Sequence, residues 1–194
     1  GGSIFQFNTN SSTWGTLCAA TTTENLNALS NRQDHDTVYV VGDNGTIIKM
    51  DISTPNSVSC ELLSSGVDVN LNDIENNASN SAAAVGEDGT FIFTENSGTT
   101  WTALDPGVSV NLNSMSTEDQ ISGYIIVGDS GTVVQFDDPV FSTISSGVSV
   151  NLNAVDARSS VADVWAVGDS GTVLYSDDSG ATWTTLTSGY HDYV

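Results

Sequence analysis

One short phrase occurs four times and carries the first candidates for chemistry: valine, glycine, an acid, any residue, glycine and threonine. The aspartates in its four copies are Asp43, Asp88, Asp129 and Asp169. Carboxylates in glycine-rich turns suggest calcium, but calcium takes six to eight oxygen ligands. Each turn supplies only one or two carboxylates, and the copies are far apart in the chain. We therefore favour hairpin turns capped by their own aspartates, and predict no metal and no cofactor.

Catalytic groupings are equally sparse. The only histidines are His35 and His191, so no Ser-His-Asp arrangement can be argued from them. Asp34-His35-Asp36 could ligate a metal, but nothing else in the sequence points to a site. The 24 acids must include some close pairs, yet no spacing singles out the two opposed carboxylates of a glycosidase. We expect no catalytic residue and no enzymatic activity.

A second phrase, Asn-Leu-Asn, recurs with the same period as the first. Its first copy is Asn25-Leu26-Asn27. Its later asparagines are Asn70, Asn72, Asn111, Asn113, Asn151 and Asn153. Buried amides must be hydrogen-bonded, so two interpretations are open. The asparagines form a ladder that ties neighbouring repeats together, which we favour. Alternatively, they line a channel that recognises a polar ligand such as a sugar.

The period of the two phrases predicts the architecture. The first glycines of the acidic phrase, Gly42, Gly86, Gly128 and Gly168, lie 44, 42 and 40 residues apart. In the last copy, residues 150–155, 161–167, 172–176 and 182–186 have the composition of short strands. The turns between them place glycines where a positive φ is expected. Four hairpin-linked strands in about 41 residues describe one blade of a β-propeller.

The whole chain, residues 1–194, is therefore predicted to be a single all-β propeller domain. Full blades are predicted at 21–66, 67–107, 108–147 and 148–189, with an outer half-blade at 1–20 and the start of a further strand at 190–194. The propeller would be five-bladed if closed. An open sheet edge is a pairing site, so we expect a protein partner or self-association through the incomplete blade.

One hairpin in the last repeat resembles an Asp-box, the Ser-x-Asp-x-Gly-x-Thr-Trp motif of the BNR-repeat propellers. Its residues are Ser176, Asp178, Gly180, Thr182 and Trp183, and a weaker copy has Thr94, Asn96, Gly98, Thr100 and Trp101. The acidic phrase also resembles the propellers of the photosystem II assembly factors (the Ycf48-like group). The resemblance implies structural roles: polar side chains hold the turn, the glycine is left-handed and the tryptophan packs beneath it.

Two activities found among similar propellers are not carried over. Sialidases hold their substrate carboxylate with three arginines, and this chain has only Arg32 and Arg158. The Ycf48-like group is thought to dock partners through a basic patch, which three basic residues cannot form.

The charge is strongly one-sided. There are 24 acidic and three basic residues, for a formal net charge of −21. Such a surface repels nucleic acid and anionic membranes. The sequence contains no run of about 18 apolar residues, so we expect no membrane insertion. Charged residues make up only 14 % of the chain, so the chain is poor in bases rather than rich in acids. We favour a halophilic or high-salt setting; the alternative is an ordinary acidic secreted protein.

Two cysteines, Cys18 and Cys60, allow one disulfide or two buried thiols. The composition favours an extracellular location, on a cell surface or a virion, where a disulfide persists. Glycosylation sequons at Asn10, Asn44 and Asn77 fit an exported protein.

These observations favour a non-enzymatic, surface-exposed propeller module for protein or glycan contact, adhesion or assembly. The alternative is a lectin or glycan-active enzyme with its site at the channel mouth. A third interpretation is that the chain is part of a larger exported protein.

Overall fold

The computed structural model describes residues 2–8, 13–18, 21–31, 36–54, 57–78, 80–117, 123–157 and 162–186. Several predictions lie outside these residues. They concern the sequon at Asn10, the basic residues Arg32 and Arg158, both histidines, and the strand at 190–194. Within the described residues, no helix is long and apolar enough to cross a membrane.

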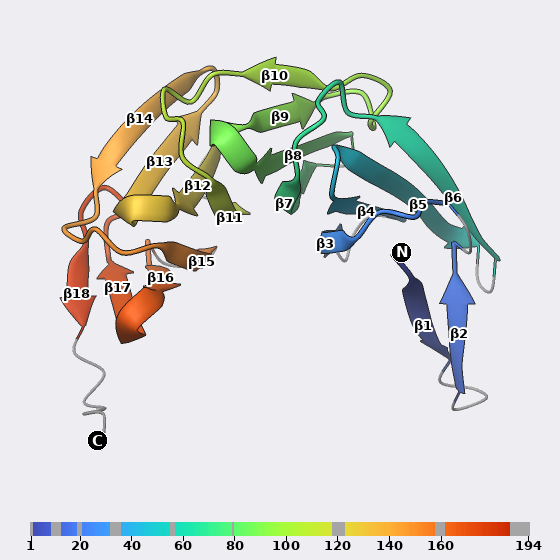
Figure 1. The fold of residues 1–194 in the computed structure, drawn as a ribbon, viewed down its shortest axis with the longest axis horizontal. Coiled ribbons are helices and arrows are strands. Elements are labelled where there is room, and N and C mark those ends of the chain that lie inside the picture. The colour runs from blue at the N-terminus through green and yellow to red at the C-terminus, as the bar shows by residue number, and fades with distance from the viewer. Residues whose placement is uncertain are drawn as a thin grey trace. The chain divides into compact units, whose positions relative to one another are not determined.

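The described chain is built from antiparallel sheets joined in sequence order (Figure 1). A two-stranded sheet comes first, with β1 (Ile4–Asn8) and β2 (Thr13–Leu17). Four four-stranded sheets follow. Their strands are β3 (Leu26–Asn31), β4 (Thr37–Gly42), β5 (Thr46–Thr54) and β6 (Ser57–Ser64); β7 (Leu71–Ala78), β8 (Ser81–Gly86), β9 (Phe91–Thr94) and β10 (Thr102–Leu104); β11 (Leu112–Thr117), β12 (Gly123–Gly128), β13 (Thr132–Asp137) and β14 (Val140–Ser145); and β15 (Leu152–Ala157), β16 (Val164–Gly168), β17 (Thr172–Ser176) and β18 (Thr184–Leu186). The predicted four-stranded blades, four of them complete and one partial, are confirmed.

The strand bounds differ from the sequence prediction in one instructive way. In the last sheet, β15 begins at Leu152 rather than at residue 150. The carbonyl of Asn151 instead accepts a hydrogen bond from the Asp169 amide at 2.9 Å. Just after this contact, the pairing register between β15 and β16 shifts between Leu152 and Ala154. The residues before the strand therefore hold the turn rather than extend the ladder.

Contacts divide the chain into two compact units. The first comprises residues 1–84 and 92–103, and the second comprises residues 85–91 and 104–194. Most of the second four-stranded sheet lies in the first unit, and residues 85–91, which include the turn between β8 and β9, belong to the second. Each unit has a core of its own.

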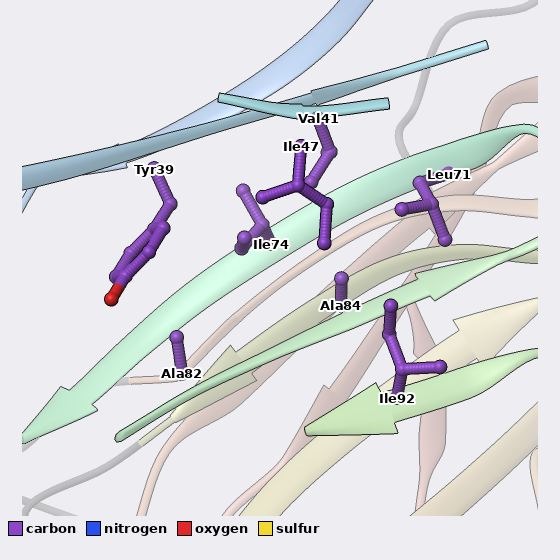
Figure 2. Packing of buried hydrophobic residues seen from close by; sticks show 8 residues of the cluster. All are labelled: Tyr39, Val41, Ile47, Leu71, Ile74, Ala82, Ala84 and Ile92. Carbon is purple, nitrogen blue, oxygen red and sulfur yellow. The ribbon is translucent and has the colours of Figure 1, made fainter. Parts of the chain in front are cut away.

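The core of the first unit lies between consecutive sheets. Tyr39, Val41 and Ile47 from β4 and β5 pack against residues of the next sheet, including Leu71 and Ile74 (Figure 2). On the other side of the same sheet, Val38, Val40, Ile48 and Met50 pack against Ile4 and Leu17 of the two-stranded sheet. Alternate residues along β4 thus face opposite neighbours, as strand geometry requires.

The second unit repeats this plan. Ile125, Val127 and Val133 of the third full sheet pack against Leu152, Val155 and Leu174 of the fourth. These residues are at most 8 % exposed, although the strands that carry them are only five or six residues long. Burial between stacked sheets stabilises each sheet, and a sheet without a neighbour on one side exposes that face.

Candidate functional site

The acidic phrase forms a turn between the second and third strands of each full sheet. Its first glycine is extended, with a φ of −159° at Gly128, so the predicted positive φ is wrong at this position. A Cβ atom at Gly128 would lie 2.3 Å from the carbonyl oxygen of Asn111. The first glycine is therefore required by close approach of the backbone, not by backbone conformation.

The second glycine of the phrase does adopt a positive φ, as predicted. Gly45 has a φ of +64°, and a Cβ atom there would lie 2.0 Å from the carbonyl oxygen of Val67 at the entry to the next sheet. Its amide donates to the carbonyl of Val69 at 2.7 Å. In the second unit Gly89 donates to Val110 in the same way, at 2.8 Å. The second glycine thus brings consecutive sheets into backbone contact.

The second asparagine of the Asn-Leu-Asn phrase links its own turn to the following sheet. Its amide nitrogen donates both to the aspartate of its own turn and to the leucine carbonyl of the next sheet. These bonds join Asn27 to Asp43 and Leu71, both at 3.0 Å, and Asn113 to Asp129 and Leu152, both at 2.9 Å. Asn153 likewise donates to Asp169 at 2.9 Å.

The first asparagine of the phrase completes the link from the opposite direction. Its side-chain oxygen accepts a hydrogen bond from the turn of the preceding sheet, from a backbone amide whose residue has a positive φ. The pairs are Asn44 to Asn70 at 3.1 Å, Asp88 to Asn111 at 3.3 Å and Ser130 to Asn151 at 3.1 Å. Neighbouring sheets therefore share a ladder of amide hydrogen bonds.

This ladder accounts for the chemistry of the repeated phrases. Asp43, Asp129 and Asp169 each accept a bond from an asparagine of their own sheet, and Asn72 also has an interaction partner. Among the described residues, no three histidine, cysteine or acidic side chains come together as metal ligands would. The arrangement holds turns and sheets together, because the amides of Asn27 and Asn113 each bond both a turn and the next sheet.

The box hairpin at 176–183 is held by its own polar side chains. The buried hydroxyl of Ser176 donates to Asp178 at 2.7 Å and accepts from the Gly180 amide at 2.9 Å. Asp178 also accepts from the amide of Thr182 at 2.8 Å and from its hydroxyl at 2.6 Å. The hydroxyl and amide of Thr182, with Ser176, hold the pKa of Asp178 below its usual value.

The weaker hairpin at 94–101 has the same bonds with an amide in place of the carboxylate. Asn96 accepts from the Thr100 amide at 2.9 Å and donates to the Thr100 hydroxyl at 2.8 Å. Thr94 takes the place of Ser176 and accepts from the Gly98 amide at 3.0 Å. The neutral side chain of Asn96 therefore bonds the same backbone amide and hydroxyl positions of the turn as the Asp178 carboxylate does.

Both hairpins press a left-handed glycine onto the preceding sheet. Gly98 has a φ of +81°, and a Cβ atom there would lie 2.6 Å from Leu63. Gly180 has a φ of +84°, and its Cβ atom would lie 2.9 Å from Ile125. Trp101 and Trp183 pack against the two cores beneath these turns. Every box residue named from the sequence lies in a structural contact.

Cys18 and Cys60 are joined by a disulfide, with a Cα–Cα distance of 5.5 Å. Cys18 follows β2 and Cys60 lies in β6, so the bond ties the two-stranded sheet to the first full sheet. Sequence reasoning left this pairing open because the cysteines fall in different repeats.

Two apolar surfaces differ from their counterparts in the other sheets. In the last sheet, Trp165 and Val167 are 42 % and 44 % exposed, whereas the corresponding Ile125 and Val127 of β12 are almost completely buried. We call Trp165 and Val167 the β16 face. The ring of Trp165 lies 4.6 Å from that of Tyr175, whose hydroxyl donates to Asp163 at 2.8 Å and has its pKa raised by that bond.

The second surface lies in the first unit, beside β1. Leu29 of β3 is 60 % exposed, whereas the corresponding Ile74, Met115 and Val155 are buried. A groove of about 350 Å³ adjoins it, lined in part by Ile4, Phe5, Leu26, Leu29 and Val40. We call this the β1 groove. Sequence reasoning missed both surfaces, although aligning the repeats would have marked these positions as interior ones.

Comparisons with known proteins support the fold of this chain but do not assign its function. No protein-family model and no curated protein matches the chain. Among solved structures, one described as YCF48 bound to D1 peptide is similar, with 16 % sequence identity and a TM-score of 0.63. The match covers 90 % of this chain and 58 % of the other, so the chain spans a little over half the length of that protein. The described chain has the all-β propeller fold predicted from its repeats.

Proposed function

We propose that the chain is a non-enzymatic propeller module of the Asp-box type that binds other proteins. The observation that carries this proposal is the exposure of Leu29, Trp165 and Val167, at positions buried elsewhere in the repeat. An exposed apolar patch is typical of a binding surface; Trp165 and Val167 are exposed together in the second unit, and Leu29 lines a groove in the first. The asparagine ladder and the carboxylate and hydroxyl groups of the box hairpin are engaged in structural bonds, so we favour the apolar surfaces as binding sites.

The structural comparison supports recognition of a peptide. The similar protein is described as bound to a D1 peptide, and it shares the propeller fold at 16 % identity. Folds do not determine function, so the support is one of precedent. A basic docking patch is not proposed, because the chain has three basic residues in all.

We further propose an extracellular, cell-surface or virion setting of high salt concentration. The net charge of −21 favours a medium that screens repulsion. The disulfide between Cys18 and Cys60 would persist in an oxidising compartment.

A glycan-binding role is the second candidate, and one observation favours it. Trp165 and Tyr175 form an aromatic pair beside the carboxylate of Asp163. An aromatic surface next to a hydrogen-bonding group suits the apolar face and the hydroxyls of a sugar. This site would lie on the β16 face rather than at the channel mouth.

A displayed peptide library, selected at high salt, tests the principal proposal. We expect peptides that bind saturably at one per chain and lose about tenfold or more in affinity with Leu29→Glu or with Trp165→Ser. Val140→Glu is the matched control, because Val140 is 59 % exposed and lies on neither surface. Peptides that bind all variants equally would contradict the proposal.

A glycan array and a glycosidase screen at the same salt concentration test the alternative. Glycan binding that Trp165→Ser abolishes would favour the lectin, and turnover of any glycoside would overturn the non-enzymatic assignment.

A further inference from the structure

The first full sheet carries a lysine at a position where the other full sheets carry an uncharged residue. The residues that correspond to Lys49 of β5 are Phe93, Gln135 and Tyr175. Lys49 pairs across the sheet with Tyr39 of β4 on one side and with Glu61 of β6 on the other. Directly paired residues point to the same face of a sheet. The three side chains therefore form one row on the face that packs against the next sheet.

The ammonium group of Lys49 is held by the box hairpin of that next sheet. The side chain is half-buried, and its nitrogen donates to the Ser97 carbonyl at 2.8 Å. A lysine ammonium has three donors, so this bond leaves two for other acceptors. Lys49 is also the only lysine or arginine in the described part of a chain whose net charge is −21. Lysine is mostly an exposed residue, so a half-buried one in this chain calls for a specific role.

A groove opens beside this row, and we call it the β6 groove. Its volume is about 290 Å³, and it is lined by Lys49, by residues 61–64 of β6 and by residues 97–99 of the hairpin. Every lining residue belongs to the first unit. The groove lies between two consecutive full sheets, so it exists however either end of the chain is completed.

Packing fixes the walls of the β6 groove. Gly98 at the hairpin tip lies so close to the first full sheet that a Cβ atom there would lie 2.6 Å from Leu63 and 3.2 Å from the Tyr39 ring. The Tyr39 ring meets that of Trp101 edge-on, with their centroids 5.9 Å apart. Figure 2 shows Tyr39 as a member of the buried cluster of this unit. A site with walls already in place loses little conformational entropy when a ligand binds.

The lining suits a neutral ligand that carries hydroxyl groups. Lys49 donates hydrogen bonds, whereas the exposed carboxylate of Glu61 accepts them. Neighbouring hydroxyls of a sugar can accept from an ammonium and donate to a carboxylate at the same time. Leu63, half-buried and on the same face as Glu61, adds an apolar surface for the C–H groups of a sugar ring. The third full sheet has Gln135 and Ser142 in place of the two charges.

From this geometry we infer that the β6 groove binds a neutral sugar unit of a glycan. Lys49 and Glu61 hold neighbouring hydroxyls, and the ring lies over Leu63. An anionic ligand would meet the carboxylate of Glu61 and the net charge of −21, and a cationic one would meet the ammonium of Lys49. The inference goes beyond the proposed protein binding, does not depend on it, and concerns a site other than the β16 face.

A second hollow extends the site. Its volume is about 280 Å³, and it shares residues 62–64 with the β6 groove before continuing along residues 44–46 and 65–67. A disaccharide reaches contacts there that a single ring lacks. We therefore expect disaccharides to bind more tightly than their monosaccharides.

The probes are the methyl glycosides of glucose, galactose and mannose, and disaccharides built from these sugars. Backbone amide NMR signals are followed during titration at about 1 M sodium chloride. For at least one probe we expect saturable shifts centred on residues 61–64 and 97–99, with a Kd on the order of 1 mM. If no probe shifts these signals at up to about 50 mM, the inference is wrong.

Substitutions of the two charged residues test their role. Lys49→Met and Glu61→Ala should each weaken binding about tenfold or more. Gln135→Met and Ser142→Ala are the matched controls, because they change the corresponding pair of the third full sheet and should leave binding unchanged. Glu61 is exposed, so Glu61→Ala decides the outcome even where Lys49→Met disturbs folding through its bond to Ser97. Equal binding by Glu61→Ala and the wild type would overturn the site.

Other outcomes would identify a different ligand or a different place. Affinity for a neutral sugar should change less than about threefold between about 0.1 and 2 M sodium chloride, because no net charge is neutralised. A uronic acid that binds about tenfold more tightly than its parent hexose, and that Glu61→Ala does not weaken, would overturn the neutral ligand. Sugar binding that Trp165→Ser abolishes and Glu61→Ala leaves intact would overturn the β6 groove in favour of the β16 face. The peptide library tests the protein-binding proposal separately.

Discussion

At the scale of residues, the repeated polar side chains are structural. Asn27 and Asn113 each hold a turn aspartate and a carbonyl of the next sheet. Ser176 and Asp178 hold a hairpin whose glycine touches Ile125. A buried or half-buried amide without a partner costs free energy, so asparagine and aspartate recur where these backbone groups recur.

Gly180→Ala should destabilise the second unit. Its φ of +84° is unfavourable for alanine, and the new Cβ atom would lie 2.9 Å from Ile125. We expect a loss of about 1–3 kcal/mol in the free energy of unfolding, measured by denaturant titration. Gly15→Ala is the control, because no atom beyond its two chain neighbours lies within 4 Å of its Cβ position. A loss of equal size in the control would show that the contact at Gly180 is unimportant.

Asp178 should make stability depend on pH. Its pKa is lowered in the folded protein by bonds from Thr182 and Ser176, so the ionised form stabilises the fold. That stabilisation is present above the unfolded-state pKa of about 3.9 and is lost as the pH falls through the lower folded value. Asp178→Asn, which copies the bonds of Asn96, should reduce the loss of stability in acid, measured as Tm against pH. An unchanged acid limb would contradict this role.

At the scale of elements, the two-stranded sheet depends most on contacts outside itself for its stability. It has two strands where the other sheets have four, and among the described residues both of its strands pair on one side only. Packing of Ile4 and Leu17 and the Cys18–Cys60 disulfide hold it against the first full sheet. The same tie keeps the β1 groove in place, because β1 is carried by β2.

Replacing both cysteines by serine should loosen this sheet. The cysteines are 42 residues apart, and closing a loop of that length restrains the unfolded chain by about 4 kcal/mol in the entropy model. We expect a loss of about 2–4 kcal/mol in unfolding free energy and faster amide exchange in Ile4–Asn8. A reducing agent should reproduce the loss in the wild-type protein and leave the double variant unchanged. Equal stability under oxidising and reducing conditions would contradict the role of the disulfide.

At the scale of the whole molecule, charge dominates. The formal net charge is −21, with three basic residues to offset 24 acids. Self-repulsion of this kind opposes the folded state and is screened by salt. The same charge favours basic partners and disfavours association with other acidic chains.

Sodium chloride should raise the Tm of the protein strongly. Screening removes self-repulsion between about 0.05 and 1 M salt, and each kcal/mol gained raises the Tm by about 2–4 °C in a chain of this size. Sucrose at equal osmolality is the control, since it is excluded from the surface but screens no charge. A Tm that responds to sucrose and not to salt would show that repulsion is unimportant.

The sequence by itself determined the repeating parts of this protein. The strand number, the hairpin turns and the box bonds follow from side chains within one repeat, and the asparagine ladder from neighbouring repeats at a constant period. The first glycine of the acidic phrase was misjudged, because Gly128 is required by the carbonyl of Asn111, a contact beyond the local turn.

Only the tertiary structure decided which apolar residues are exposed and which cysteines pair. Trp165 and Ile125 occupy the same position in their repeats, yet one is 42 % exposed and the other 1 %. Leu29 and Ile74 differ in the same way. Burial depends on whether another sheet covers the face, and that neighbour lies about 40 residues away in the chain. Local pattern reports which side of a strand is apolar, whereas the packing of sheets determines whether that side is available to a partner.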